Sequence, residues 1–284
     1  MKRVLISTAV AALFFASCDT STPTSHESDL VTAAKPVSPP GLSVASLKQP
    51  ASVTLPDGRV AERRVHIFWR KGYGPDHSNA KGGNGGSGKP GGSGKPGGGG
   101  SDCYAFIAKG AKWKVTEDYM VDQSGGFEVS GAQLSSAIAQ SVSAWNSEAG
   151  VAVFGDEITD TVDGADETST DGKNEVLFGF IDDPGVIAVT ITWGIFGGSP
   201  RNRQLVEWDL VFNDPDFYWG DADLDASVMD VLNIAVHEVG HAGGMSHPDG
   251  TCVDETMYAY ASNGETRKRT LNAGDIAGIK ALYK

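Results

Sequence analysis

The stretch from His237 to His247 constrains this chain most, because it spaces three histidines, one glutamate and one glycine in a fixed pattern, His-Glu-Val-Gly-His-Ala-Gly-Gly-Met-Ser-His. On a helix, His237 and His241 are four residues apart and project from the same face, so both imidazoles can hold one metal ion. Glu238 falls beside that face, where its carboxylate can take a proton from an attacking water without binding the metal. The pattern therefore predicts a helix that carries a metal site.

The third histidine, His247, has to reach the metal from beyond the helix, because a third ligand on the same helix could not close a tetrahedral site. Gly243 and Gly244 allow the chain to turn back, since glycine accepts the left-handed conformation that ends helices. Three protein ligands leave a fourth zinc position open, which is the catalytic arrangement. The alternative is a buried helix with hydrogen-bonded histidines, but five fixed positions make coincidence about one in ten thousand or rarer.

This stretch resembles the metzincin metallopeptidases, whose signature is H-E-x-x-H-x-x-G-x-x-H followed by a methionine turn. Met257 follows His247 at the place where that methionine would stand. The resemblance implies that His237, His241 and His247 bind one catalytic zinc ion. It also implies that Glu238 is the general base and that Met257 packs beneath the metal without binding it.

The order of elements over residues 103–284 is similar to the matrixin branch of the metzincins, and Leu271–Ile279 resembles the entry to their closing helix. The resemblance implies an α+β catalytic domain with a twisted, mostly antiparallel-edged sheet, two long helices and a short C-terminal helix. Ala259 stands where some relatives have a tyrosine ligand, so none is expected. The resemblance also implies that a peptide substrate pairs with a sheet edge at Gly185–Thr190.

Hydrophobic periodicity predicts three helices and several strands within that domain. The first helix begins near Ser130 and ends at Gly150, and the second runs from about residue 225 to 243. The third helix follows Asn272 and turns Ile276, Ile279 and Leu282 inward. The predicted strands are Val151–Phe154, Glu175–Ile181, Val186–Trp193 and Leu205–Phe212.

The part of the chain before residue 103 reads as segments outside the catalytic domain. Residues 1–18 are typical of an export signal of the lipoprotein type, with Cys18 as the lipidated residue. Residues 19–77 form a tether or a short pro-segment, in which Val53 to Trp69 looks like two short strands around a turn. Residues 78–102 are rich in Gly, Ser, Lys and Pro and are typical of a flexible linker.

The two cysteines that remain after export, Cys103 and Cys252, are expected to form a disulfide in an oxidising compartment. The alternative is that Cys103 blocks the metal as a latency switch, but its neighbours lack the motif of the matrixin switch. The formal net charge of −13 makes nucleic acid a poor partner.

Acidic residues crowd the loop from Asp156 to Asp171, and Asp182 and Asp183 follow further on. Oxygen-rich loops of this kind suit Ca²⁺ as well as plain solvation. A calcium ion is therefore an open expectation with unknown ligands. Matrixins commonly bind a second, structural zinc through histidines between the first helix and the active-site helix. This chain has no histidine between His77 and His237, so the resemblance implies only one zinc ion.

The resemblance implies a zinc endopeptidase that acts on proteins or peptides. The N-terminal signal predicts that it is exported, at the cell surface or secreted, and we expect a monomer. Its contact with a membrane would come only through the lipid anchor at Cys18. The rival interpretation is an inactive metzincin-like domain that serves as a surface adhesion or binding module. A third is the hydrolysis of cell-wall peptides, which needs the same zinc site.

Overall fold

The computed structural model describes residues 41–75 and 102–284, all within one compact unit. The predicted signal at 1–18, the first part of the tether and nearly all of the linker at 78–102 lie outside the described residues, so these remain predictions. Among the residues that are described, no helix has the length and apolar character needed to cross a membrane.

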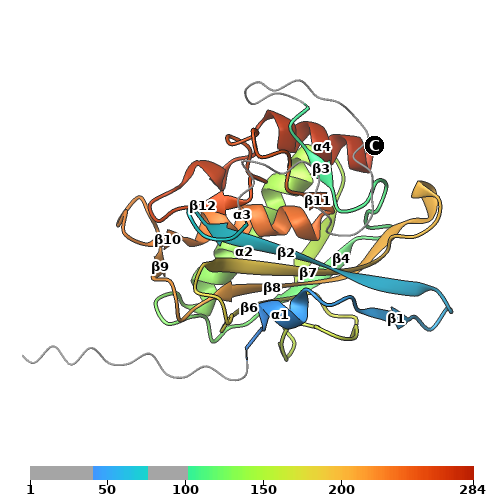
Figure 1. Ribbon diagram of the computed structural model, residues 1–284, viewed down its shortest axis with the longest axis horizontal. Helices are drawn as coiled ribbons and strands as arrows, with labels where there is room; N and C mark the ends of the chain where they lie inside the picture. Colours follow the sequence, from blue (N-terminus) through green and yellow to red (C-terminus); the bar gives the residue numbers. More distant parts are fainter. Residues whose placement is uncertain (1–40, 76–101) are drawn as a thin grey trace, which may run out of the picture. The chain divides into compact units, whose positions relative to one another are not determined.

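The centre of the fold is an eight-stranded mixed sheet (Figure 1). Along the sheet the strands are β1 (Ser52–Thr54), β2 (Val60–Arg70), β7 (Val186–Ile195), β8 (Gln204–Asn213), β6 (Glu175–Gly179), β4 (Glu117–Val121) and β5 (Phe154–Glu157), and β12 (Tyr260–Ala261) pairs with β2. The strands from β1 to β8 in this order are antiparallel, and those from β8 to β5 are parallel. The predicted α+β class with one antiparallel side of the sheet is confirmed.

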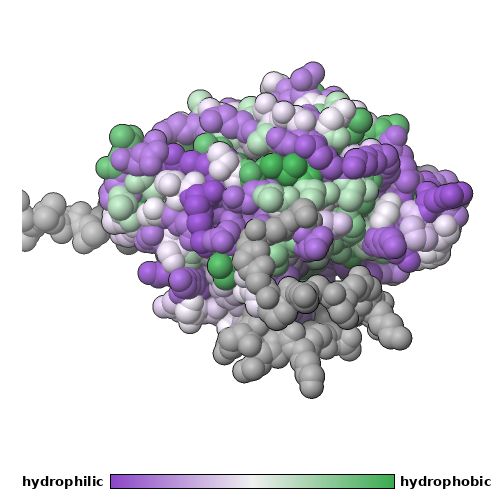
Figure 2. Space-filling view, turned by 90° about the horizontal axis from the view of Figure 1, so that it is seen from above, coloured by the Kyte–Doolittle hydropathy of each residue, from purple (hydrophilic) through white to green (hydrophobic). Residues whose placement is uncertain are grey.

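Helices α2 (Gly131–Ala149), α3 (Val231–Ala242) and α4 (Ala273–Tyr283) lie on one face of the sheet, and the short α1 (Val44–Leu47) lies on the other (Figure 1). A large apolar cluster fills the space between the sheet and α2 and α3. A smaller one on the opposite face joins α1 to β2 and β7. Seen from the side of α4, the surface is largely hydrophilic with smaller hydrophobic areas (Figure 2).

Helix α2 begins and ends where its sequence predicts. Ser130 caps it, because its hydroxyl accepts a hydrogen bond from the backbone N–H of Gln133 at 3.4 Å. Gly150 ends the helix at φ 71°, a left-handed conformation that glycine adopts without strain. Leu134, Ile138 and Trp145 are fully buried on its inner face. The tryptophan also donates a hydrogen bond from Nε1 to Val236 O of α3 at 2.8 Å.

The second predicted helix begins later than expected, at Val231 instead of about residue 225. The reason is local side-chain chemistry. The carboxylate of Asp225 accepts a hydrogen bond from Ser227 N at 2.8 Å, which closes a turn. The carboxylate of Asp230 then accepts one from Asn233 N at 2.7 Å and caps the helix. The strand predicted at Val151–Phe154 is likewise displaced, to Phe154–Glu157.

The expected start of the folded domain near residue 103 is wrong in this structure. Strand β2 pairs with β7 over Glu62 to Trp69 and lies inside the sheet. The segment looked too short for a core of its own, but it needs none, because its side chains enter the two apolar clusters of the main sheet. The predicted tether at 19–77 therefore contains part of the domain.

Shorter elements complete the fold and bring the chain to the site. Two-residue strands pair as β3 (Ala105–Phe106) with β11 (Met245–Ser246), and as β9 (Trp219–Gly220) with β10 (Met229–Asp230). Three-residue 3₁₀ turns cover Pro200–Asn202 and Arg267–Arg269. The predicted disulfide between Cys103 and Cys252 is confirmed, with Cα atoms 5.6 Å apart.

Candidate metal centre

Helix α3 presents His237 and His241 from one face, as their spacing requires. Both side chains are fully buried, because the helix packs between α2 and the sheet. After Gly243 ends the helix, Gly244 turns the chain at φ 97°. Of the two predicted turn glycines, only Gly244 is left-handed. The strand β11 then carries the chain to His247.

The three histidines converge through their Nε2 atoms. These lie 3.2 Å apart between His237 and His241, and 3.1 Å apart between His247 and each of the other two. Zinc–nitrogen bonds of about 2.0–2.1 Å at tetrahedral angles would place such nitrogens about 3.3 Å apart. The set of donor atoms therefore fits a zinc ion.

The outer nitrogens of two rings are committed to backbone carbonyls. His237 Nδ1 lies 2.6 Å from Thr256 O, and His241 Nδ1 lies 2.9 Å from Met245 O. A carbonyl can only accept, so each Nδ1 carries the proton and each Nε2 lone pair faces its neighbours. Burial also lowers the pKa of His237 well below its usual 6.5 and that of His241 to about 4. Neutral rings with lone pairs directed at one point are what a cation binds.

Glu238 directly follows His237 on α3, and its side chain is fully buried. Thr190 Oγ1 of β7 donates a hydrogen bond to its Oε2 at 2.5 Å, whereas its Oε1 has no partner in the structure. Burial raises the pKa of Glu238 to about 8, although the threonine hydrogen bond acts in the opposite direction. A buried carboxylate with one fixed and one unpaired oxygen is suited to exchange a proton with a bound molecule.

Met257 lies under α3 at the predicted methionine turn and is fully buried. A Cβ atom placed on Gly240 would lie 2.3 Å from Met257 Sδ and 2.6 Å from Trp145 Cζ2, so only glycine fits between them. The turn itself is held by Asp275 of α4, whose carboxylate accepts hydrogen bonds from Thr256 N at 2.7 Å and Met257 N at 3.1 Å. No motif in the sequence pointed to this role of Asp275.

The part of the chain that carries this arrangement matches a known protein family. The family model described as matrixin matches residues 206–284, which include β8, α3, the methionine turn and α4. This part of the chain is matrixin-like. No curated protein matches the chain. The predicted resemblance is therefore confirmed over the region that carries the three histidines.

Strand β2 lies against the histidines of the matrixin-like domain. The ring of Phe68 stacks on His237 with centroids 3.8 Å apart, and the ring of His66 stacks on His241 at 4.2 Å. Neither was predicted as a site residue, although the alternating apolar pattern of Val60 to Trp69 indicated a strand. The expectation that Gly185–Thr190 forms a free sheet edge is wrong. These residues lie at the start of β7, and β7 is flanked by β2 on one side and β8 on the other.

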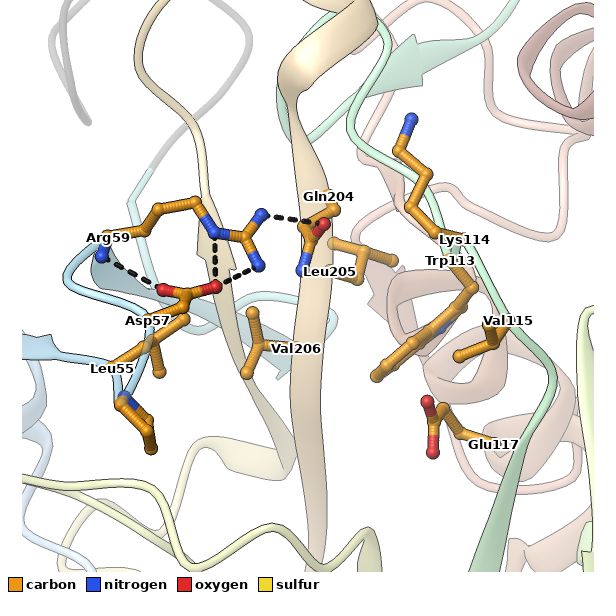
Figure 3. Close-up of a pocket in the computed structure, with 11 residues that line it drawn as sticks. Leu55, Asp57, Arg59, Trp113, Lys114, Val115, Glu117, Gln204, Leu205 and Val206 are labelled. Carbon is orange, nitrogen blue, oxygen red and sulfur yellow. Dashed lines mark hydrogen bonds and ion pairs between the residues drawn. The ribbon is translucent and has the colours of Figure 1, made fainter.

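A pocket on the surface lies beside the start of β2, at the opposite end of this strand from Phe68. Figure 3 shows the residues that line it. It lies beside the turn between β1 and β2, the start of β8 and the segment from Trp113 to Glu117. Its polar part is a hydrogen-bonded group in which Arg59 contacts Asp57 and Gln204. Because Arg59, Asp57 and Gln204 already bond to one another, this pocket is a weaker candidate for the functional site than the three histidines.

A second cluster of possible metal ligands lies where the acidic loop meets the sheet. Carboxylate oxygens of Asp166, Asp171 and Glu207 lie within 4.8 Å of one another, and Asp163, Asp171 and Glu175 form an overlapping group. Glu207 is fully buried, and its Oε1 has no partner in the structure. Burial raises the pKa of Glu207 to about 9 and that of Glu175 to about 7.

Proposed function

We propose that this chain is a zinc-dependent endopeptidase that hydrolyses peptide bonds in proteins or peptides. The observation that carries the proposal is the convergence of the Nε2 atoms of three histidines, one of which is followed directly by Glu238 with its unpaired Oε1. The matrixin match over the same residues supports it. In the proposal, His237, His241 and His247 hold the metal, and Glu238 is the catalytic base.

Each residue has a defined part in the proposed mechanism. Zinc, when bound, supplies a Lewis acid that polarises a carbonyl group and increases the acidity of water. The hydroxyl of Thr190 fixes Oε2 of Glu238, which leaves Oε1 to take the proton of the attacking water. Glu238 then passes this proton to the leaving amine. Thr256 O and Met245 O hold the rings of His237 and His241 in the tautomer that binds metal.

The zinc content of the purified chain and its cleavage of casein test this proposal together. We expect about one zinc ion per chain, loss of cleavage on chelation, and recovery when zinc is added back. Both the full chain and the variant Phe68→Ala are assayed, because the Phe68 ring covers His237. If the chain binds zinc but neither form cleaves any member of a broad peptide library, the endopeptidase proposal is wrong. The interpretation as a binding module would then replace it.

We also propose that the second cluster binds a Ca²⁺ ion. Its carboxylates would be the ligands of the calcium ion that the sequence left open. Glu207, Asp166 and Asp171 would supply carboxylate oxygens, as hard cations of this size require. The unpaired, buried Oε1 of Glu207 supports a cation there. Among the residues that the structure describes, the only basic side chain seen to form an ion pair with these carboxylates is Lys173. Its Nζ lies 3.1 Å from Asp163 Oδ2 and 3.7 Å from Asp171 Oδ2.

The remaining expectations concern where the protein acts. We propose an exported protein, attached to a membrane through Cys18 or secreted, and monomeric. The disulfide supports export, because such bonds persist in oxidising compartments. Proteins or peptides are the proposed partners, and the acidic charge argues against nucleic acid.

A further inference from the structure

Strand β2 is held between two other main chains beside the three histidines. It is antiparallel to β7 on one side and parallel to β12 on the other. On the β12 side, Trp69 N donates to Ala259 O at 3.2 Å and Lys71 N donates to Ala261 O at 2.8 Å. If β2 were withdrawn, these two main chains would border a groove along the metal site. An extended peptide is the ligand that pairs with such exposed backbone groups.

The side chains of β2 alternate between the groove and the opposite face, as a strand requires. His66 and Phe68 point to the histidines of the metal centre. Val65, Ile67 and Trp69 pack into the apolar cluster on the other side of the sheet. The half of β2 that lies at the metal centre thus presents every second side chain to it, as a bound peptide would.

The side chain of Phe68 fills a pocket that suits an aromatic ring. It is fully buried and lies nearly parallel to the His237 ring, with an interplanar angle of 5°. The Nζ of Lys268 lies 5.9 Å from the centre of the Phe68 ring, within range of a cation–π interaction. Lys268 is itself fully buried and forms an ion pair with Glu265 at 2.9 Å. Because the ring stacks on an imidazole and lies within range of an ammonium group, this pocket favours a flat aromatic side chain.

We propose that β2 is an intramolecular ligand of the substrate groove. It occupies the place of an extended peptide substrate, with Phe68 in the pocket beside His237, and thereby keeps other peptides out. This inference rests on the proposed endopeptidase function. It also assigns a substrate class, namely extended peptides with a large aromatic side chain at the position of Phe68.

The two ends of β2 are held differently, which allows one half to leave the groove. Arg63 anchors the N-terminal half, because its Nη2 donates to the carbonyls of Ser46, Leu47 and Gln49 at 3.2, 3.1 and 2.7 Å. The half from His66 onward is held by main-chain pairing with β7 and β12, and by the packing of Ile67 and Trp69 in the opposite cluster. An external peptide therefore has to displace only this half.

The first test compares two variants of the full chain on one fluorogenic peptide that carries an aromatic residue. Phe68→Ala removes the side chain in the pocket, and Val65→Ala removes a side chain that faces the opposite cluster and lies outside the half that leaves the groove. We expect Phe68→Ala to cleave at least about tenfold faster than the parent, because the competent open state becomes more populated. Val65→Ala should stay within about twofold of it. The intact mass of each protein, measured in parallel, verifies that β2 is uncut.

The second test measures binding without any cleavage. A labelled peptide with the sequence of residues 60–70 is added to the chain carrying Phe68→Ala and Glu238→Gln, and fluorescence anisotropy is recorded. The peptide should bind, and a peptide with alanine at the position of Phe68 should bind at least about tenfold more weakly. The Glu238→Gln chain with its own Phe68 should bind either peptide much more weakly, since its groove is occupied.

The outcomes separate this inference from the proposed function. If the double variant binds the peptide as expected but no form cleaves anything, the groove assignment stands and the endopeptidase does not. If the parent cleaves freely and Phe68→Ala is no faster, the enzyme stands and the intramolecular ligand is wrong. Equal acceleration by Phe68→Ala and Val65→Ala would also overturn it, because it would indicate general loosening of β2.

Discussion

At the scale of single residues, the metal centre depends on side chains that fix other side chains. Thr190 fixes one oxygen of Glu238, and the carbonyl of Thr256 fixes the ring of His237. The convergence of His237 and His241, with Glu238 next to the first of them, could be predicted from their spacing, because residues four apart share one face of a helix. Thr190 and Thr256 could not, because contacts with them are set by the packing of β7 and the methionine turn against α3.

Two glycines of the metal helix give a matched residue-scale prediction. Gly240→Ala would place a methyl group 2.3 Å from Met257 Sδ, so we expect a loss of about 1–3 kcal/mol in the free energy of unfolding and weaker zinc binding. In Gly243→Ala the nearest contact is 3.4 Å and φ is −79°, so the methyl group fits. Chemical denaturation and zinc titration of both variants measure the difference. Equal stability of the two would contradict the packing assigned to Met257.

At the scale of secondary structure, periodicity and caps located most elements. Ser130 and Gly150 bound α2 as predicted, and β7 and β8 lie within two residues of their expected ends. The start of α3 was missed because Asp225 closes a turn and Asp230 is the cap; both are acidic residues before the same helix. Nothing in the local sequence ranks one of these carboxylates above the other.

The acidic loop and the strands β6 and β8 give a prediction about pH. Burial moves the pKa of Glu207 from 4.5 to about 9, so the folded state binds more protons than the unfolded state between these values. Stability without calcium should therefore fall as pH rises through this range. A bound Ca²⁺ ion offsets the repulsion between the ionised carboxylates.

Thermal unfolding at pH 5 and pH 8, with and without calcium and with zinc held constant, measures this effect. At pH 8, calcium at a hundredfold excess over its dissociation constant should add about 2.7 kcal/mol. For a domain of this size that raises the melting temperature by about 5–10 °C. The gain should be smaller at pH 5, and Glu207→Gln should reduce it. If the melting temperature changes with neither calcium nor pH, the proposed calcium site is wrong.

At the scale of the whole molecule, the main lesson concerns β2. It pairs with β7 across more than a hundred residues of sequence, and local patterns carry no information about such distant pairing. The glycine-rich stretch after residue 77 suggested a boundary between a tether and a domain. In the structure, β2 on one side of this stretch and β7 on the other belong to one sheet. Composition indicated a linker but could not indicate that both flanks fold together.

The disulfide also acts at this scale, since it joins positions that are 149 residues apart in the sequence. Cys103 precedes the first short strand after the glycine-rich stretch, and Cys252 lies between His247 and Met257. It therefore ties the loop beside the metal centre to the distant segment that precedes β3. Its pairing could be predicted because only two cysteines remain once Cys18 is assigned to the predicted export signal.

The central claim is that Glu238 moves the proton while the three histidines hold zinc, and the variant Glu238→Gln tests it most directly. Zinc content and casein cleavage are measured in the full chain and, in parallel, in the Phe68→Ala background, so that β2 does not mask the rate. We predict about one zinc ion per chain, as in the parent, and cleavage at least about a hundredfold slower. Cleavage as fast as that of the matching protein with Glu238 intact would contradict the mechanism.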